Sequence, residues 1–227
     1  RESIMALNPQ TVTIYGRLSW PVWTMAQAIE RNKTSQYPKA DDRVAPSFNL
    51  FVEEDQLDKL LKHVETEFLP WVEARGKAGE KRNALSAREI KKIKDLIASK
   101  DWEDQPPFIP IKPVPEKSVE LAPEAVASIS INGQAGRDLI QKAIVRSEDQ
   151  LVDPSSRSTF PGVVPIEETT FSMYGGCVAA ATLNLYSFVA AGSPGFSASA
   201  NTVVFREDAE SFSGSVAVDE DDMLLDD

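Results

Sequence analysis

The sequence predicts a mainly β protein with α-helical inserts, in which a small β-barrel is decorated by helices. Apolar and polar residues alternate through residues 10–23, as in a strand with one buried face. Its buried residues are Val12, Ile14 and Leu18. The strongest β signal begins at residues 171–192, where a long run, a turn and a second run indicate a hairpin. Helical periodicity falls between these strands, and strands that flank helical inserts favour such a barrel.

The chain between the first two expected strands is polar. Pro21 should end the first strand, because proline has no N–H to donate within a central strand. Residues 24–46 are then expected to form a long loop, and residues 47–54 a second strand. The residues of that second strand that point one way are Phe48, Leu50 and Val52.

A helical insert is expected over about residues 55–100. An apolar stripe with helical spacing consists of Leu57, Leu60, Leu61, Val64 and Phe68. Pro70 should end or kink this first helix. A second helix should follow Ser86, because Ser86 and Glu89 form a capping box ahead of three isoleucines at helical spacing. Eight bases and two acids lie within residues 75–94, and a solvated helix face is the simpler interpretation of them.

The C-terminal half begins with an extended connection. Residues 104–123 hold six prolines and should form surface chain with short edge strands. Residues 125–131 should be a strand. Residues 136–147 are expected to be a short amphipathic helix or a strand-flanking loop, and residues 150–170 to be rich in loops.

The final hairpin contains two sets of turn residues. Gly175 and Gly176 suggest a bulge or a tight bend inside its first strand. The turn between its two strands is expected at Ser193, Pro194 and Gly195.

Charge is concentrated at the C-terminus. The net charge is −11, yet residues 207–227 hold nine acids and no base, so the rest of the chain has 24 bases against 26 acids, a net charge of −2. We expect residues 1–9 to be a cloning remnant with a lead-in, residues 10–206 to be the barrel domain, and residues 207–227 to be an acidic, disordered tail. The single cysteine excludes an intrachain disulfide and indicates a reducing compartment. No apolar run reaches the length of a membrane span.

Enzyme motifs are absent from the sequence. The segment GQAGRD lacks the spacing of a phosphate-binding loop, and no nucleophile elbow accompanies the single histidine, His63. Cys177 lies in a β run, where a buried small residue is the simpler interpretation. The clustered tail acids lack the spacing of a calcium loop. We therefore expect no enzyme activity, no cofactor and no metal site.

Aromatic and basic residues are interleaved near the N-terminus. They are Tyr15, Arg17, Trp20, Trp23, Arg31, Lys33, Tyr37, Lys39 and Arg43. Aromatic rings stack on the bases of single-stranded nucleic acid, and Lys or Arg binds its phosphates. Strand alternation places Tyr15 and Arg17 opposite the core face, as in a barrel whose outer face binds a strand. The alternative is that the aromatics, Trp20 and Trp23 above all, pack as core under the long loop.

Several segments together resemble a known family. They are GRLSWP, the Tyr37-Pro38-Lys39 of the polar loop, SFNLFVEE, YGGCVAAATLNLYSF, ANTVVFREDAESFSG and the acidic terminus. Over most of residues 10–227, and most sharply over residues 174–214, the chain is similar to the single-stranded DNA-binding proteins of tailed bacteriophages. The resemblance implies an OB-fold-like five-stranded β-barrel. It also implies sequence-independent coating of single-stranded DNA in replication, recombination and repair, in the cytoplasm of the bacterial host.

The resemblance further implies a binding groove and a tail for partners. The candidate nucleic-acid-binding residues are Tyr15, Arg17, Trp20, Trp23, Lys33, Tyr37, Lys39, Arg43 and Tyr174. Replication proteins such as DNA polymerase or helicase are expected to contact a set of tail residues. These are Asp219, Glu220, Asp221, Asp222, Leu224, Leu225, Asp226 and Asp227. Because a disordered acidic segment mimics the charge of DNA, the tail should also compete with DNA for the groove.

Two alternatives stay open at this stage. The protein could be a structural or interaction protein of a phage complex that binds protein only, and the tail could be a solubilising segment. Tails of this family commonly finish with an aromatic residue, whereas this chain finishes with two leucines and two aspartates. Met223, Leu224 and Leu225 could then supply the apolar element for partner docking.

Overall fold

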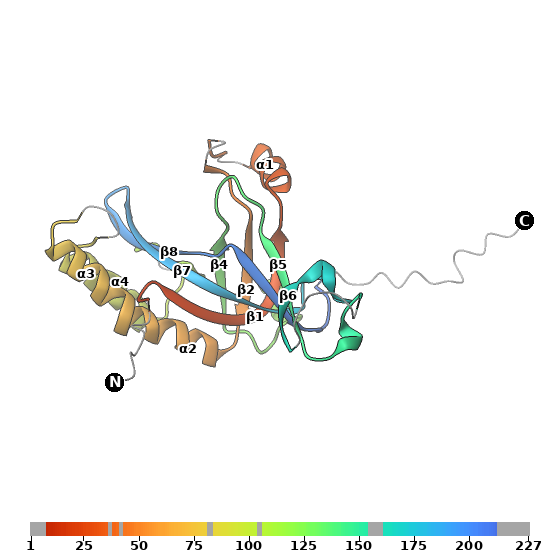
Figure 1. The fold of residues 1–227 in the computed structure, drawn as a ribbon. Coiled ribbons are helices and arrows are strands. Elements are labelled where there is room, and N and C mark those ends of the chain that lie inside the picture. Colours follow the sequence, from red (N-terminus) through yellow and green to blue (C-terminus); the bar gives the residue numbers. More distant parts are fainter. Residues whose placement is uncertain are drawn as a thin grey trace, which may run out of the picture.

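Five strands close into a barrel in the computed structural model, which describes residues 8–35, 38–40, 43–80, 84–103, 106–153 and 161–212 (Figure 1). They are β1 (Thr11–Val22), β2 (Ser47–Val52), β4 (Ala127–Asn132), β7 (Val178–Ala190) and β8 (Ser193–Ser199). The strands pair in the order β1-β2-β4-β8-β7, and β7 pairs with β1 to complete the ring. All these pairs are antiparallel except β4 with β8. The predicted mainly β, OB-fold-like five-stranded barrel is confirmed.

Further strands extend the barrel sheet. They are β3 (Ile111–Lys112), which pairs with β4, β9 (Thr202–Glu207), which pairs with β7, and β5 (Ile140–Val145) and β6 (Gly162–Pro165), which continue the sheet beyond β9. The prediction of a helix or loop over residues 136–147 is therefore wrong. Ala143 and Val145 are buried at alternate positions of β5, and a parallel pairing with the distant β9 stabilises this strand.

The first strand continues through its proline. Val12, Ile14 and Leu18 are buried on one face of β1, as predicted. The expectation that Pro21 ends the strand is wrong, because the pairing of β1 with β2 resumes at Val22 after a register shift. Such an irregularity tolerates a residue that cannot donate to the ladder.

A short helix, α1 (Met25–Lys33), occupies part of the region that the sequence predicts to be loop. Thr24 caps it: the Thr24 hydroxyl accepts a hydrogen bond from the Gln27 backbone N–H, and the Gln27 side chain accepts one from the Thr24 N–H. Ala28 is the one buried residue of this helix, so there is no apolar stripe by which the sequence could reveal it. Helix α1 lies at one end of the barrel, away from the helical insert that follows β2 (Figure 1).

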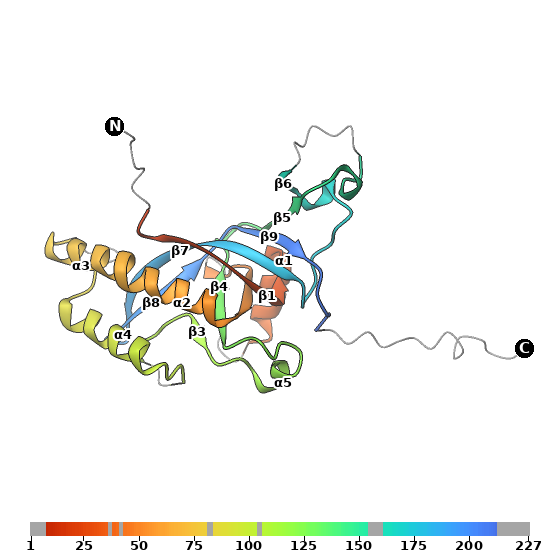
Figure 2. The same cartoon turned by 90° about the horizontal axis from the view of Figure 1, so that it is seen from below.

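The long helices lie together along one side of the barrel (Figure 2). They are α2 (Glu54–His63), a π-helical turn (Val64–Phe68), α3 (Leu69–Lys77) and α4 (Ala87–Ser99), and α5 (Glu116–Val119) is a single turn. The helix does not end at Pro70, because the π-helical turn runs directly into α3 and the Leu69 N–H still donates to the Val64 carbonyl. The proline instead coincides with this local change of helical hydrogen bonding. Ser86 and Glu89 form the predicted capping box. The rings of Phe68 and Phe196 are 5.9 Å apart, which joins the apolar stripe of the helices to the barrel core.

The predicted C-terminal hairpin is present, but its turn lies two residues earlier than expected. Ala190 pairs with Ser193, so the turn consists of Ala191 and Gly192, whose φ angles are 49° and 77°. Positive φ at both central positions is the geometry of a type I′ turn, which matches the twist of the two strands. The Ser-Pro-Gly sequence instead forms the start of β8. Gly176, with a φ of 114°, makes the expected bend, but the bend lies just before β7 and not inside the strand.

Candidate nucleic-acid interface

A groove of about 970 Å³ lies where the β7–β8 hairpin leaves the barrel. It is lined by α3, by the second half of β7, by the end of β8 and by the turn after β4. OB-type barrels bind oligonucleotides across strand faces and between the loops that border them. The groove is therefore the place in the described structure to look for a nucleic-acid interface.

Three aromatic rings line this groove. Tyr186 and Phe188 are two residues apart on β7 and share its outer face, with ring centroids 6.4 Å apart. Phe188 extends over Gly195, where a Cβ would come within 2.9 Å of the phenylalanine Cζ, so the glycine makes room for the ring. Trp71 of α3 contributes the third ring. All three are partly exposed, although the Trp71 ring also stacks on the Phe68 ring at 6.1 Å between centroids. Exposed ring faces are the groups on which bases stack.

One guanidinium group lies among these rings. The Arg75 Cζ is 4.8 Å from the centroid of the Trp71 ring, a cation–π contact that orients the side chain. Arg75 also forms an ion pair with Glu80. Tryptophan and arginine at i and i+4 on one helix therefore present a ring and a positive charge to the same groove.

The remaining lining is polar and uncharged. Asn184 pairs with Ser199 across the hairpin, and Ser199 lies opposite Asn132 of β4, which makes a polar strip across three strands. Gln10 extends this strip at the start of β1, where its side-chain amide donates to the Leu185 carbonyl at 3.2 Å. Amides and hydroxyls can both donate and accept hydrogen bonds, so this strip suits the polar edges of bases and sugars.

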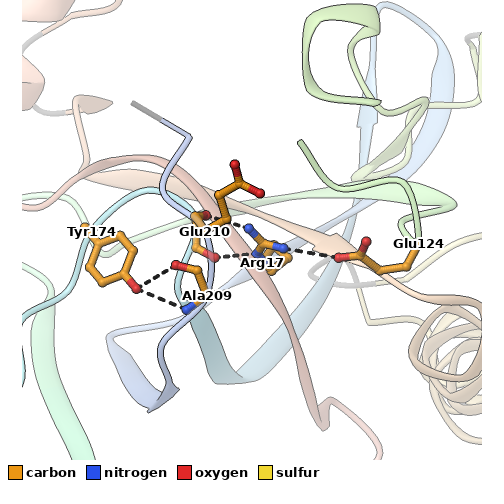
Figure 3. Close-up of polar contacts among 6 residues, drawn as sticks. Arg17, Glu124, Tyr174, Ala209 and Glu210 are labelled. Carbon is orange, nitrogen blue, oxygen red and sulfur yellow. Dashed lines mark hydrogen bonds and ion pairs between the residues drawn. The ribbon is translucent and has the colours of Figure 1, made fainter. Parts of the chain in front are cut away.

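The residues predicted from the sequence fall into two described groups, and the first lies along β1. Tyr15 is half-buried on the outer face of β1, and the Arg206 guanidinium lies 4.3 Å from its ring centroid. Arg17 and Tyr174 both contact the chain just after β9, over residues 208–212 (Figure 3). Burial raises the pKa of the Tyr174 hydroxyl, which keeps it protonated and able to donate.

The second group surrounds α1. Trp23 is partly buried and packs against the core, and its carbonyl accepts a hydrogen bond from the Leu139 N–H at 2.8 Å. Lys33 forms an exposed ion pair with Glu30 at 2.9 Å. Lys39 and Arg43 are exposed, and Asn32 holds the Lys39 backbone by two hydrogen bonds.

The other predicted site residues lie outside the described residues. Tyr37 and all the tail residues from Asp219 to Asp227 belong to this set, as does the side chain of Trp20. None of the predicted residues whose side chains the structure describes lines the groove. Trp71, Arg75, Tyr186 and Phe188, which do line it, were not predicted as site residues. Strand alternation could have revealed Tyr186 and Phe188, and helical spacing could have paired Trp71 with Arg75.

No other chemistry emerges from the described parts of the chain. Burial raises the pKa of the Cys177 thiol, so this cysteine is not activated as a nucleophile. Within the described ranges, no group of three or more His, Cys, Asp or Glu side chains is placed to hold a metal ion. Nor does any helix among these residues have the length and apolar character needed to cross a membrane.

Solved structures of phage single-stranded DNA-binding proteins are similar to this chain. The protein from bacteriophage Enc34 is 15% identical, with a TM-score of 0.47, covering 94% of this chain and 89% of that chain. The same protein in complex with ssDNA gives 16% identity and a TM-score of 0.40, covering 89% of each chain. Gp2.5, a single-stranded DNA binding protein encoded by bacteriophage T7, is 10% identical, with a TM-score of 0.45, covering 91% of this chain and 97% of that chain. No protein-family model matches the sequence, and no curated protein matches it.

Proposed function

We propose that the protein binds single-stranded DNA without sequence preference and coats it. The observation that supports this most is the groove in which Trp71, Tyr186 and Phe188 bring three rings to one hollow. Every base has a flat face, so stacking on such rings tolerates any sequence and contributes about 1–3 kcal/mol per base. The strip of amides and hydroxyls beside the rings suits the rest of the nucleotide.

Cations at the edge of this surface are proposed to bind the phosphates. Arg75 lies in the groove itself, and Lys33, Lys39 and Arg43 are exposed in the segment that joins β1 to β2. In OB-type barrels the corresponding connection borders the bound strand. The aromatic residues predicted in and around that segment, which are Tyr15, Trp20, Trp23 and Tyr37, are proposed as further stacking positions.

The acidic tail is proposed to act in the same function. Residues 213–227 carry six acids and no base, so they can compete with DNA for Arg75 and the exposed cations at the edge of the groove until DNA displaces them. Once displaced, the tail is free to contact replication proteins such as a DNA polymerase or helicase. Work of this kind in phage replication, recombination and repair would take place in the cytoplasm of the bacterial host, without catalysis by this chain.

Titration of the full chain with oligo(dT) tests the proposal. Tryptophan fluorescence should be quenched as bases stack on Trp71, and the logarithm of the affinity should fall linearly with the logarithm of salt concentration. The slope should be about −0.7 for each phosphate that the protein neutralises. If neither the full chain nor a chain that ends at Phe212 binds at low salt, DNA binding is excluded. The protein would then be assigned to the alternative, an interaction protein that binds protein only.

A further inference from the structure

The chain that follows β9 folds back onto the barrel instead of leaving it directly. Residues 208–212, here called the strap, run beside the bend that precedes β7 (Figure 3). The Phe212 N–H donates to the Gly175 carbonyl at 2.9 Å. The Tyr174 hydroxyl donates a hydrogen bond to the Ala209 carbonyl at 2.8 Å and accepts one from the Ala209 N–H at 3.1 Å. The strap is thus held at both of its ends.

Arg17 binds the middle of the strap. Its guanidinium donates to the Glu210 carbonyl at 2.6 Å and to the Gly176 carbonyl, and it forms an ion pair with Glu124 at 3.3 Å. The Arg17 side chain is only 14% exposed. A charge that is this deeply buried needs such partners, because loss of water is otherwise costly. Each of the three guanidinium nitrogens of Arg17 therefore has a protein oxygen as a partner.

The strap packs closely against the barrel through a buried ring and through a glycine that leaves it room. Phe212 is 9% exposed, and its ring lies 5.5 Å from that of Phe51 and 5.0 Å from the Arg17 guanidinium carbon. At Gly176 a Cβ would come within 2.2 Å of the Glu210 carbonyl oxygen, so only glycine permits the strap to approach this closely. Packing and hydrogen bonding both make the strap part of the folded protein.

We propose that Arg17 and Tyr174 form a clamp that fixes the root of the acidic tail, and that they do not contact DNA. The clamp holds the chain up to Phe212, and the six acids from Asp219 onward follow it in the sequence. As positioning residues, Arg17 and Tyr174 act on DNA binding only through the tail, a role that rests on the proposed function.

The anchoring point suits a tail that reaches the groove of its own molecule. Residues 213–227 span at most about 50 Å when extended. Val178, beside the strap, and Tyr186, in the groove, are separated along β7 by about 27 Å. An extended chain that starts at Phe212 covers this distance by its ninth residue, so the acids from Asp221 onward are within reach of the groove. A tethered segment competes best when its length matches the span that it must cover.

Hydrogen exchange and DNA titration of two clamp variants test the proposal on the full chain. Arg17→Gln removes the guanidinium. Tyr174→Phe removes only the hydroxyl, and it tests the same clamp if Arg17→Gln folds poorly. Exchange of the amides within residues 208–212 should become about tenfold faster in both variants. Exchange in β7 should keep its wild-type rate, which separates release of the strap from loss of the fold. Lys91→Gln removes an exposed charge on α4 and should change neither region.

The salt dependence of oligo(dT) binding decides between a clamp and a phosphate contact. A clamp predicts that Arg17→Gln keeps the wild-type slope and an affinity within about twofold, because a tail longer by five residues has nearly the same effective concentration. A phosphate contact predicts weaker binding and a slope whose magnitude is smaller by about 0.7. Either that smaller slope or unchanged exchange in the strap overturns the proposal. If the wild-type protein fails to bind DNA, the exchange measurement still decides whether the clamp exists.

Discussion

At the scale of single residues, the groove depends on which face of β7 each side chain occupies. Tyr186 and Phe188 lie on the outer face, whereas Leu185 is fully buried. Ser187, between the two rings, is 6% exposed, and its hydroxyl has no hydrogen-bond partner among the described residues. Ser187 shares the inward face of β7 with Leu185, so only the two rings of this stretch face outward.

The contribution of one ring can be measured with Tyr186→Ala. Loss of a stacking platform worth about 1–3 kcal/mol should weaken oligo(dT) binding about 5- to 150-fold, without a change in the salt slope. Tyr186→Phe keeps the ring and should bind within about twofold of wild type. Val189→Ala, at an exposed position of the same strand, is the matched control and should have no effect. Equal binding by Tyr186→Ala and the control would remove Tyr186 from the interface.

Residue roles were predictable from the sequence only where they follow from local spacing. Alternation places Tyr15 and Arg17 on the outer face of β1, and the structure agrees. The same alternation does not reveal that Arg17 meets Glu210, because the two residues are 193 positions apart and are joined only by the fold. Trp71 and Arg75 likewise face the groove because of how α3 packs, which the helical period alone does not determine.

At the scale of elements, the sequence predicts those that carry a strong apolar pattern and misses those that do not. The stripe of α2 and the long run of β7 are buried as their periodicity indicates. α1 has a capping box but no stripe, and β5 depends on its pairing with β9. The local apolar pattern is weak in α1 and in β5, so capping decides the structure of α1 and strand pairing that of β5.

The turn of the β7–β8 hairpin offers a test at this scale. Ala191 adopts a φ of 49°, a left-handed conformation that is costly for alanine and well tolerated by asparagine. Ala191→Asn should therefore raise the free energy of unfolding by about 0.5–1 kcal/mol, measured by urea denaturation. Ala191→Val should lower it, because a β-branched side chain fits this conformation poorly. A turn at residues 193–195 would leave both variants close to wild type.

At the scale of the whole molecule, closure of the barrel brings distant segments together. The parallel contact of β4 with β8 pairs Ile131 with Ala198, and β1 closes on β7 through Ile14 and Ala181. Local periodicity predicts the strands, but their order depends on such long-range pairs. The strap is a further consequence of closure, because it contacts β1 and the bend before β7 together.

Two truncations separate the free tail from the folded protein. A chain without residues 213–227 loses six acids and keeps every residue of the described fold, so its melting temperature should stay within about 1 °C of wild type. A chain without residues 207–227 also loses the buried Phe212 ring and leaves Arg17 without its strap partner. Loss of a buried phenylalanine costs about 3–5 kcal/mol, so this chain should melt at least about 6 °C lower in calorimetry.

DNA binding by the chain that lacks only residues 213–227 then reports on the tail itself. At low salt, the chain that ends at Phe212 should bind oligo(dT) several-fold more tightly than the full chain, because the acidic competitor is gone. The difference should shrink as salt screens the tail from the groove. Replacement of the six tail acids by their amides in the full chain is the matched control and should reproduce the tighter binding. Equal affinity of all three chains would leave the tail with a solubilising role, while the melting temperatures would still place the end of the fold at Phe212.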